Sequence, residues 1–233
     1  MNTPRLSVII PVFNEEKTVG VLIRRLLSVP FSGWTTEIIV VNDGSTDGTA
    51  SVLSGFSPQV RVINIPKNSG KGSAVKEGIK AATGDFAIIQ DADLECQPEE
   101  IPLLLHVLRN FTPGERIVVM GSRELHKKNP KKLILSRLGA LSITKLMNIL
   151  YGASLTDVLM GYKLFPKAAF GYFNSGGFES EVIFIARLLK EGYRIVEVPV
   201  SYNPREVDAG KKMKYRHGFK TIIRLLIFWI TGY

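Results

Sequence analysis

The sequence predicts an α/β protein whose core is a mainly parallel β-sheet covered by helices on both faces. Strand-like apolar runs and helical patterns alternate through the first 121 of its 233 residues. Three of the strand-like runs end in clusters of polar or acidic residues. An apolar content of 45% and a charged content of 22% are those of an ordinary globular protein.

In the first half, short runs rich in apolar and β-branched residues predict strands, and the segments between them predict helices. The expected strands are Leu6–Ile10, Glu37–Val41, Val60–Ile65, Phe86–Gln90 and Ile117–Gly121, and the expected helices cover about 15–28, 46–54, 71–82 and 98–110. Repeated strand–helix–strand units favour parallel strand pairing.

The second half begins with a basic loop and a long predicted helix. Its expected elements are the loop 124–132, a helix over about 133–150, the strand Tyr162–Phe165, a helix over Phe178–Glu191, the strand Arg194–Val200, a basic loop at 203–214 and a helix over about 215–231. No segment rich in Gly, Pro or Ser divides the two halves. We therefore expect residues 1–233 to form a single domain whose C-terminal part caps the sheet.

Polar clusters at 14–16, 42–45 and 91–93 stand at the ends of three expected strands. Ligands of open α/β sheets bind beyond the C-terminal ends of the strands. The three clusters are therefore expected to form one site.

The third cluster is the most informative. Asp91, Asp93 and Glu95 follow an apolar strand, and three carboxylates so close together repel one another unless a cation binds between them. Oxygen ligands on a loop suit Mg²⁺ or Mn²⁺, which keep positions open for substrate phosphates. A polar turn also explains an isolated D-x-D motif, so the metal interpretation depends on the other motifs.

The first two clusters carry further candidates. Asn14 is expected to cap the following helix, and Glu15 either compensates the helix dipole or helps to hold a nucleotide base or ribose. Asp43 could accept a hydrogen bond from a uracil or guanine N–H, and Ser45 or Thr46 is expected to cap the next helix. Neither G-x-G-x-x-G nor G-x-x-x-x-G-K-[ST] occurs, which argues against a dehydrogenase and against a glycine loop around a phosphate.

The positive charge is concentrated in the second half. Residues 1–123 carry 12 Lys and Arg against 13 Asp and Glu, whereas residues 124–233 carry 18 against 8. This asymmetry indicates phospholipid head groups, a phosphorylated substrate or nucleic acid as partner, unless it is only a well-solvated surface. Nucleic-acid binding would leave the D-x-D motif without a role, so we expect no nucleic-acid partner.

Other classes are excluded by simple counts. The single cysteine, Cys96, excludes an intramolecular disulfide and fits a reducing compartment. Residues 6–13 are too short for a signal peptide, and no run reaches the roughly 20 apolar residues of a membrane span.

Several short motifs follow one another in a fixed order. They are Pro-Val-Phe-Asn-Glu at 11–15, Val-Asn-Asp-Gly-Ser-Thr-Asp-Gly-Thr at 41–49, Asn-Ser-Gly-Lys-Gly at 68–72, Asp-Ala-Asp at 91–93 and Gly-Ser-Arg at 121–123, with further matches at 156–163, 177–181 and 205–214. In this order they resemble glycosyltransferase family 2, and within it the polyprenyl-phosphate sugar transferases such as the dolichyl-phosphate mannose and glucose synthases. The resemblance covers nearly the whole chain.

The resemblance implies an A-type glycosyltransferase fold, a nucleotide-diphosphate sugar donor, a Mg²⁺ or Mn²⁺ ion and inversion at the anomeric carbon. It places the base and ribose on Pro11, Phe13, Glu15 and Asp43 with Lys71 nearby, the metal and donor diphosphate on Asp91, Ala92 and Asp93 with Glu95 as a third metal ligand, and a closing loop on Arg205, Lys212 and Lys214.

The expected reaction moves a hexose from a UDP-glucose or GDP-mannose type of donor to polyprenyl or dolichyl phosphate. Arg123 and Arg137 match guanidiniums on the acceptor phosphate, and they join Asp93 and Asp157 as the expected catalytic residues. A phosphate oxygen is already anionic, so it needs charge neutralisation rather than a strong base. The alternative is transfer to a sugar hydroxyl in polysaccharide or glycolipid synthesis, with Asp157 as general base.

The helices at 133–150 and 215–231 are either ordinary core elements or amphipathic helices that face a membrane. The terminal one sets Lys220 and Arg224 beside a broad apolar face, which suits an anionic membrane surface. Many related proteins continue into transmembrane helices here, so we expect a peripheral protein at the cytoplasmic face of a membrane, a truncated chain, or a chain with a homo-oligomer or membrane partner. Residues 1–123 are then the nucleotide-sugar-binding half, and residues 124–233 the acceptor-binding and membrane-facing half.

Overall fold

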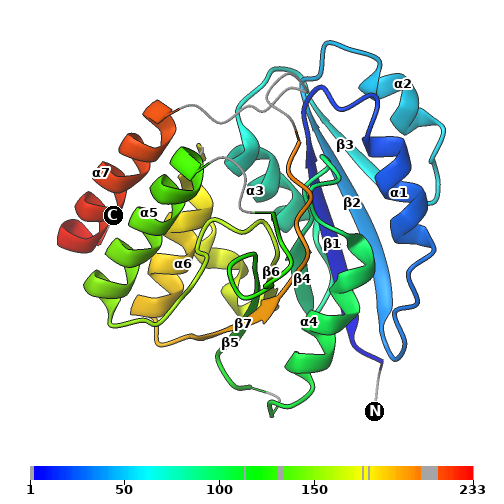
Figure 1. Cartoon of the computed structure of the whole chain (residues 1–233). Coiled ribbons are helices and arrows are strands. Elements are labelled where there is room, and N and C mark those ends of the chain that lie inside the picture. The colour runs from blue at the N-terminus through cyan, green and yellow to red at the C-terminus, as the bar shows by residue number, and fades with distance from the viewer. Residues whose placement is uncertain are drawn as a thin grey trace.

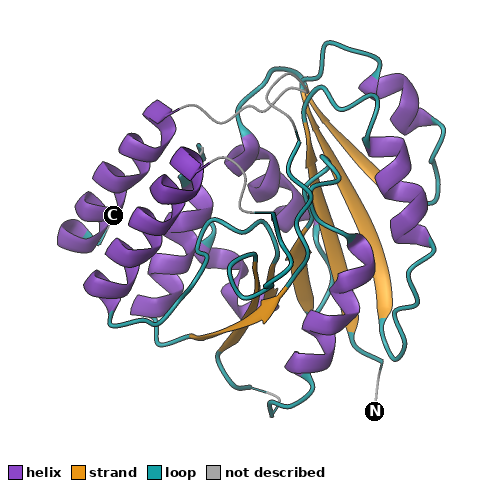
Figure 2. Cartoon of the chain, in the orientation of Figure 1, coloured by secondary structure: helices purple, strands orange, loops and turns teal. Residues whose placement is uncertain are grey.

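The computed structural model has the predicted α/β architecture, with one sheet between two layers of helices (Figures 1 and 2). The structure describes residues 3–112, 114–130, 134–174, 176–177, 179–205 and 215–232, without the side chains of 134–136 and 215–217. Lys212 and Lys214, which were expected in the closing loop, lie outside the described residues.

Within the described residues, the sheet has seven strands in the order β3-β2-β1-β4-β6-β5-β7. Their bounds are β1 Arg5–Val12, β2 Thr35–Asp43, β3 Arg61–Ile65, β4 Phe86–Ile89, β5 Ile117–Ser122, β6 Lys163–Pro166 and β7 Arg194–Pro199. All neighbouring strands pair in parallel except β6, which is antiparallel to both β4 and β5. The prediction of a mainly parallel sheet is confirmed.

Helices cover both faces of the sheet because the central strands are apolar on both sides. The helices are α1 Val19–Leu27, α2 Thr49–Ser54, α3 Lys71–Ala81, α4 Ile101–Leu108, α5 Ile134–Tyr151, α6 Ser180–Lys190 and α7 Tyr215–Thr231, with the 3₁₀ turns η1 Pro98–Glu100 and η2 Lys167–Tyr172. Along β1, Val8 and Ile10 pack with α1 and α4, whereas Ile9 packs in the cluster that includes α3, α5, α6 and α7. This alternation is the period of two expected of a strand.

Two helix starts differ from the prediction. Helix α1 begins at Val19, and its N-cap residue is Thr18 rather than Asn14. Asn14 has a φ of 52°, and its side-chain oxygen accepts a hydrogen bond from the N–H of Thr46 at 2.8 Å. Helix α2 begins at Thr49, and its N-cap residue is Gly48 rather than Ser45 or Thr46. The caps expected from the two polar clusters are therefore wrong, because these residues tie the two turns to each other.

The antiparallel strand β6 has a consequence for the site. Because it runs against its neighbours, its first residue, Lys163, pairs with Met120 of β5, close to the C-terminal end of that strand. Next to it, Leu164 pairs with Ile88, one residue before the end of β4. The start of β6 therefore lies at the same sheet edge as the acidic cluster that follows β4.

Candidate active site

One cavity of about 960 Å³ opens at the C-terminal edge of the sheet. Every described residue that the sequence analysis assigned to the site lines it: Pro11, Phe13, Glu15, Asp43, Lys71, Asp91, Ala92, Asp93, Glu95, Arg123, Arg137, Asp157 and Arg205. The sheet thus brings residues almost 200 positions apart in the sequence into one space.

The end of the cavity near β1 and β2 is built on buried polar contacts. Glu15 accepts a hydrogen bond from the hydroxyl of Thr18 at 2.7 Å, and its N–H donates to the hydroxyl oxygen of Thr49 at 2.9 Å. Asp43 is 2% exposed, and its two oxygens accept hydrogen bonds from the N–H groups of Ser69 and Gly70 at 2.9 and 2.8 Å. Asp43 therefore fixes the loop that leads into α3 while it lines the cavity.

A glycine lets the turn after β2 approach that loop. Gly44 has a φ of 66°, and a Cβ there would lie 2.6 Å from the backbone nitrogen of Asn68. No other residue fits this position without moving the backbone, so Gly44 permits the contact that places Asp43.

Two cations contact the acidic cluster after β4 in this structure. Asp91 contacts the Lys71 ammonium at 2.6 Å, and Asp93 contacts the Arg205 guanidinium at 3.3 Å. Burial and the charges of Asp91 and Glu95 raise the pKa of Asp93 to about 7. The cluster therefore carries more negative charge than its surroundings balance.

The Glu95 side chain is hydrogen-bonded to the segment that follows β7. Its carboxylate accepts hydrogen bonds from the hydroxyl of Tyr202 at 2.6 Å and from the N–H of Arg205 at 3.0 Å. Arg205 also contacts Glu15 at 3.1 Å, so it joins three acidic side chains. Glu95 thereby anchors the chain that follows β7, and its role as a third metal ligand stays a prediction.

The residues suit a metal ion whose coordination is completed by a bound ligand rather than by protein side chains alone. Among the described residues, no group of three His, Cys, Asp or Glu side chains is arranged to hold a metal ion. Mg²⁺ and Mn²⁺ sites for phosphorylated substrates often use only one or two carboxylates and complete their coordination with phosphate oxygens. Asp91 and Asp93, which face cations in one cavity, are the candidate carboxylates of such a site.

Behind Asp91 lies a buried ion-pair chain that the sequence analysis did not identify. Lys71 contacts Glu181 at 2.7 Å, and Glu181 contacts Lys163 at 2.9 Å. Burial alone would raise the pKa of Glu181, but the two lysines lower it to about 2. The sequence did offer one sign of this chain, the lysine that begins the apolar strand Lys-Leu-Phe. A lysine buried in such a strand needs a carboxylate partner.

The opposite end of the cavity holds the two expected arginines. Arg123 forms a two-point ion pair with Asp157, at 2.6 Å from Nε and 2.7 Å from Nη2, and its guanidinium lies over the ring of Tyr202. Arg137 forms a two-point pair with Glu124, with Nε 2.8 Å from the carboxylate. Both arginines line the cavity, whereas the sequence analysis did not identify their carboxylate partners.

Asp157 is itself held from two sides. Its side chain is 3% exposed, and the N–H of Arg123 donates to it at 3.0 Å, while its own N–H donates to Glu197 at 2.9 Å. Burial raises the pKa of the Glu197 carboxyl group. Asp157 is thus a fixed, ion-paired carboxylate in the cavity wall.

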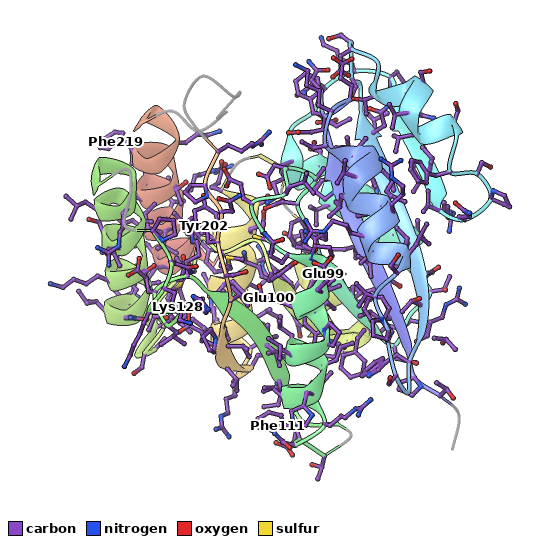
Figure 3. All side chains as sticks on the ribbon, turned by 45° about the vertical axis from the view of Figure 1, so that its right-hand side comes forward. Glu99, Glu100, Phe111, Lys128, Tyr202 and Phe219 are labelled. Atoms are coloured by element: carbon purple, nitrogen blue, oxygen red, sulfur yellow. The ribbon has the colours of Figure 1, made fainter. Side chains whose placement is uncertain are left out.

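An apolar surface lies on α5 and α7 beside this end of the cavity. Its exposed residues are Leu138 and Ile149 on α5 and Phe219, Ile223, Leu226, Ile227, Trp229 and Ile230 on α7. Phe219, 69% exposed, marks α7 at the left edge of Figure 3. Of the helices that the structure describes, none combines the length and the apolar character needed to cross a membrane.

The fold and the cavity are those of an α/β protein with an acidic motif at a strand end and cationic residues opposite. Residues 7–172 match the family described as "Glycosyl transferase family 2". The chain belongs to this family, and it is a family 2 glycosyltransferase.

Several named proteins are similar over most of the chain. Dolichyl-phosphate beta-glucosyltransferase ALG5C of Trichomonas vaginalis is 32% identical over 84% of this chain and 63% of its own length. Dolichyl-phosphate beta-glucosyltransferase of Homo sapiens is 30% identical over 99% of this chain and 77% of its own length. The low-salt glycan biosynthesis hexosyltransferase Agl6 of Haloferax volcanii is 29% identical, and the chain spans 55% of it.

Solved structures establish the fold. Glucosyl-3-phosphoglycerate synthase from Mycobacterium tuberculosis, in complex with phosphoglyceric acid, superposes with a TM-score of 0.72 at 22% identity, over 96% of this chain and 79% of that one. The same enzyme with Mn²⁺, UDP-glucose and phosphoglyceric acid gives a TM-score of 0.71, over 97% and 80%. The expected A-type glycosyltransferase fold is confirmed.

Proposed function

We propose that this protein transfers glucose from UDP-glucose to a polyprenyl phosphate such as dolichyl phosphate, with inversion at the anomeric carbon. The observation that carries the proposal is that one cavity joins Asp91 and Asp93 to Arg123 and Arg137. Two of the named relatives are dolichyl-phosphate glucosyltransferases, and a structural neighbour was crystallised with UDP-glucose. Both favour UDP-glucose over a GDP-mannose type of donor.

At the donor end, Asp91 and Asp93 would hold a Mg²⁺ or Mn²⁺ ion, which would neutralise the donor diphosphate when bound. Of the residues that the structure describes, Lys71 and Arg205 are the cations that contact these carboxylates, one on each. Pro11, Phe13, Glu15 and Asp43 line the part of the cavity proposed for the base and ribose. Residues 1–123 would thereby form the donor-binding half.

At the acceptor end, Arg137 is the better candidate for a direct contact with the acceptor phosphate. Its side chain is 38% exposed, whereas that of Arg123 is 23% exposed and has its Nε and Nη2 on Asp157. Arg123 neutralises the buried Asp157 carboxylate, so this carboxylate does not repel an acceptor phosphate. The cavity walls beside Arg137 include Ala140 and Leu141 of α5, which suit the first carbons of a lipid chain.

The ion pair of Asp157 favours a phosphate acceptor over a sugar hydroxyl. A general base needs a carboxylate oxygen within hydrogen-bond reach of the proton that it removes. Both oxygens of Asp157 lie on the Arg123 guanidinium, which disfavours the base role. An anionic acceptor phosphate needs no base, so the arrangement is consistent with lipid phosphate.

The apolar surface of α5 and α7 would face the membrane that holds such a lipid. Lys145, Lys220 and Arg224 accompany its exposed apolar residues, and cations beside an apolar face bind anionic lipid surfaces. Residues 124–233 would then be the acceptor-binding half, at the cytoplasmic side where nucleotide sugars are available.

A product assay tests the function. The protein is incubated with Mn²⁺ and either UDP-glucose or GDP-mannose, and with either a polyprenyl phosphate or a glycolipid that offers only hydroxyl groups. We expect a glucosylated lipid phosphate that is labile to mild acid, formed only from UDP-glucose. An acid-stable product on the glycolipid, lost in Asp157→Asn, would favour the hydroxyl acceptor instead.

A further inference from the structure

Four charged side chains of alternating sign, all lining the cavity, form a chain that ends at the acidic motif. Lys163 contacts Glu181 at 2.9 Å, Glu181 contacts Lys71 at 2.7 Å, and Lys71 contacts Asp91 at 2.6 Å. Lys163 is fully buried, and the side chain of Glu181 is 12% exposed. Charges buried to this degree need partners, and here each of the middle two has one on either side.

Close packing fixes this chain. A Cβ at Gly161 would collide with the Asp91 carboxylate, and a Cβ at Gly72 would collide with the Ser180 side chain at the start of α6. Lys163 also donates a hydrogen bond to the carbonyl oxygen of Met160. The antiparallel start of β6 and the first turns of α3 and α6 are thereby held against Asp91.

The position of Glu181 limits how far Lys71 can neutralise Asp91. The Lys71 ammonium lies between two carboxylates at almost equal distances, so its charge is shared between them. Without Glu181, the same ammonium would pair with Asp91 alone and compete with a cation for that carboxylate. Lys163 contacts the other oxygen of Glu181 and compensates its charge from behind.

We propose that Glu181 is a positioning residue for the donor end of the site. It divides the charge of Lys71 so that Asp91 keeps the capacity to bind a divalent cation together with the donor diphosphate, and Lys163 supports Glu181. This inference rests on the proposed function, because it assumes that Asp91 serves such a cation.

A purely structural ion-pair cluster makes different predictions. Removing one member of a buried pair is strongly destabilising, whereas replacing both members by apolar residues is often neutral. If the cluster were only structural, ligand binding would follow stability: Lys163→Met would bind worst, and the double variant Lys163→Met/Glu181→Leu would bind like wild type. If Glu181 positions Lys71, binding follows the presence of Glu181 instead.

The experiment measures Mn²⁺ and UDP binding by calorimetry, and stability by urea unfolding, for wild type, Glu181→Gln, Lys163→Met and the double variant. Lys80→Met is the matched control, because Lys80 pairs with Glu77 on the exposed side of the same helix as Lys71. We expect Glu181→Gln and the double variant to bind Mn²⁺ with UDP at least about tenfold more weakly. Lys163→Met should be the least stable variant yet bind within about threefold of wild type, as should the control.

Wild-type affinity in the double variant would overturn the inference, and this holds even if Lys163→Met fails to fold. The proposed function is tested by a separate result. If the variants show the expected binding pattern but the wild type transfers no sugar to polyprenyl phosphate, the role of Glu181 is supported and the proposed acceptor is contradicted.

Discussion

The two halves of the molecule build their parts of the cavity in different ways. The half up to residue 123 carries nearly balanced charge and places acidic groups at the ends of parallel strands, where backbone N–H groups and buried hydroxyls hold them. The half from residue 124 carries an excess of cations, several of which form ion pairs with carboxylates within the cavity. Backbone geometry thus places the acidic end of the cavity, where Lys71 and Arg205 pair with it, whereas the arginines of the other end are held by side-chain ion pairs.

This difference predicts that the donor end is sensitive to the loss of single carboxylates. Asp93→Ala should lower sugar transfer about a thousandfold, because it removes a group proposed for the cation that neutralises the diphosphate. The thermal midpoint should stay at or above that of wild type, because Asp93 is repelled by its neighbours in the folded protein. Transfer rate and thermal unfolding are measured together.

Glu99→Gln is the control for this variant, because Glu99 is an exposed carboxylate that pairs with Arg25 away from the cavity. Metal removal gives the same test without a substitution. Wild type in excess EDTA should lose activity and regain it with Mn²⁺. Retained turnover in EDTA or in Asp93→Ala would rule out the metal.

At the acceptor end, the geometry of the arginine should matter more than its charge. Arg137→Lys should lower kcat/KM for the polyprenyl phosphate by about 10- to 100-fold, because lysine keeps the charge but loses the two-point contact. UDP binding should stay unchanged, since Arg137 lies away from the acidic motif. Steady-state kinetics and calorimetry measure the two effects.

Arg24→Lys serves as the matched control, since Arg24 lies on α1 and its guanidinium lies over the ring of Phe56. Unchanged acceptor kinetics in Arg137→Lys would contradict a phosphate contact at this residue and move the choice to the hydroxyl acceptor.

The apolar surface of α5 and α7 should affect membrane binding without affecting the site. Phe219→Ser/Ile230→Ser should weaken binding to vesicles that contain anionic lipid by about tenfold or more, because each exposed side chain contributes roughly 1–2 kcal/mol when it enters the interface. Vesicle co-sedimentation measures this, and UDP binding in solution should not change. Equal sedimentation of wild type and variant would exclude this surface as the lipid contact.

The smallest effect is expected far from the cavity, at the start of β2. Burial alone would raise the pKa of Glu37, but hydrogen bonds from Ser7 and Thr83 and the charge of Arg5 lower it. A lowered folded pKa stabilises the protein above the unfolded value of about 4.3, and this stabilisation is lost as the pH falls through the folded pKa. Urea unfolding from pH 6 to pH 3 should therefore show a shallower loss of stability in Glu37→Gln. Parallel pH profiles would contradict this role.

The sheet and the position of the acidic cluster at its edge could be predicted from the sequence because their signals are local. An apolar run and the polar residues at its end lie within a dozen positions of each other, as for Phe86–Gln90 and Asp91. Parallel strands then bring such ends together without further information.

The ion pairs could not be predicted in this way, because they join residues that only the finished fold brings together. Arg123 and Asp157 are 34 positions apart, and Glu95 meets Tyr202 at a separation of 107. The same limitation explains why Asn14 was expected to cap a helix. Instead of capping the helix, Asn14 contacts the second turn, 32 positions away.

We propose that the cationic end of the cavity binds the phosphate of the acceptor. This phosphate contact is tested most directly by comparing two acceptors with the same lipid chain, polyprenyl phosphate and the corresponding polyprenol, in one assay with UDP-glucose and Mn²⁺. We predict glucosylation of polyprenyl phosphate, with polyprenol used at least about a thousandfold less efficiently. Comparable glucosylation of polyprenol, or none of either lipid while a sugar hydroxyl is used, would contradict the claim.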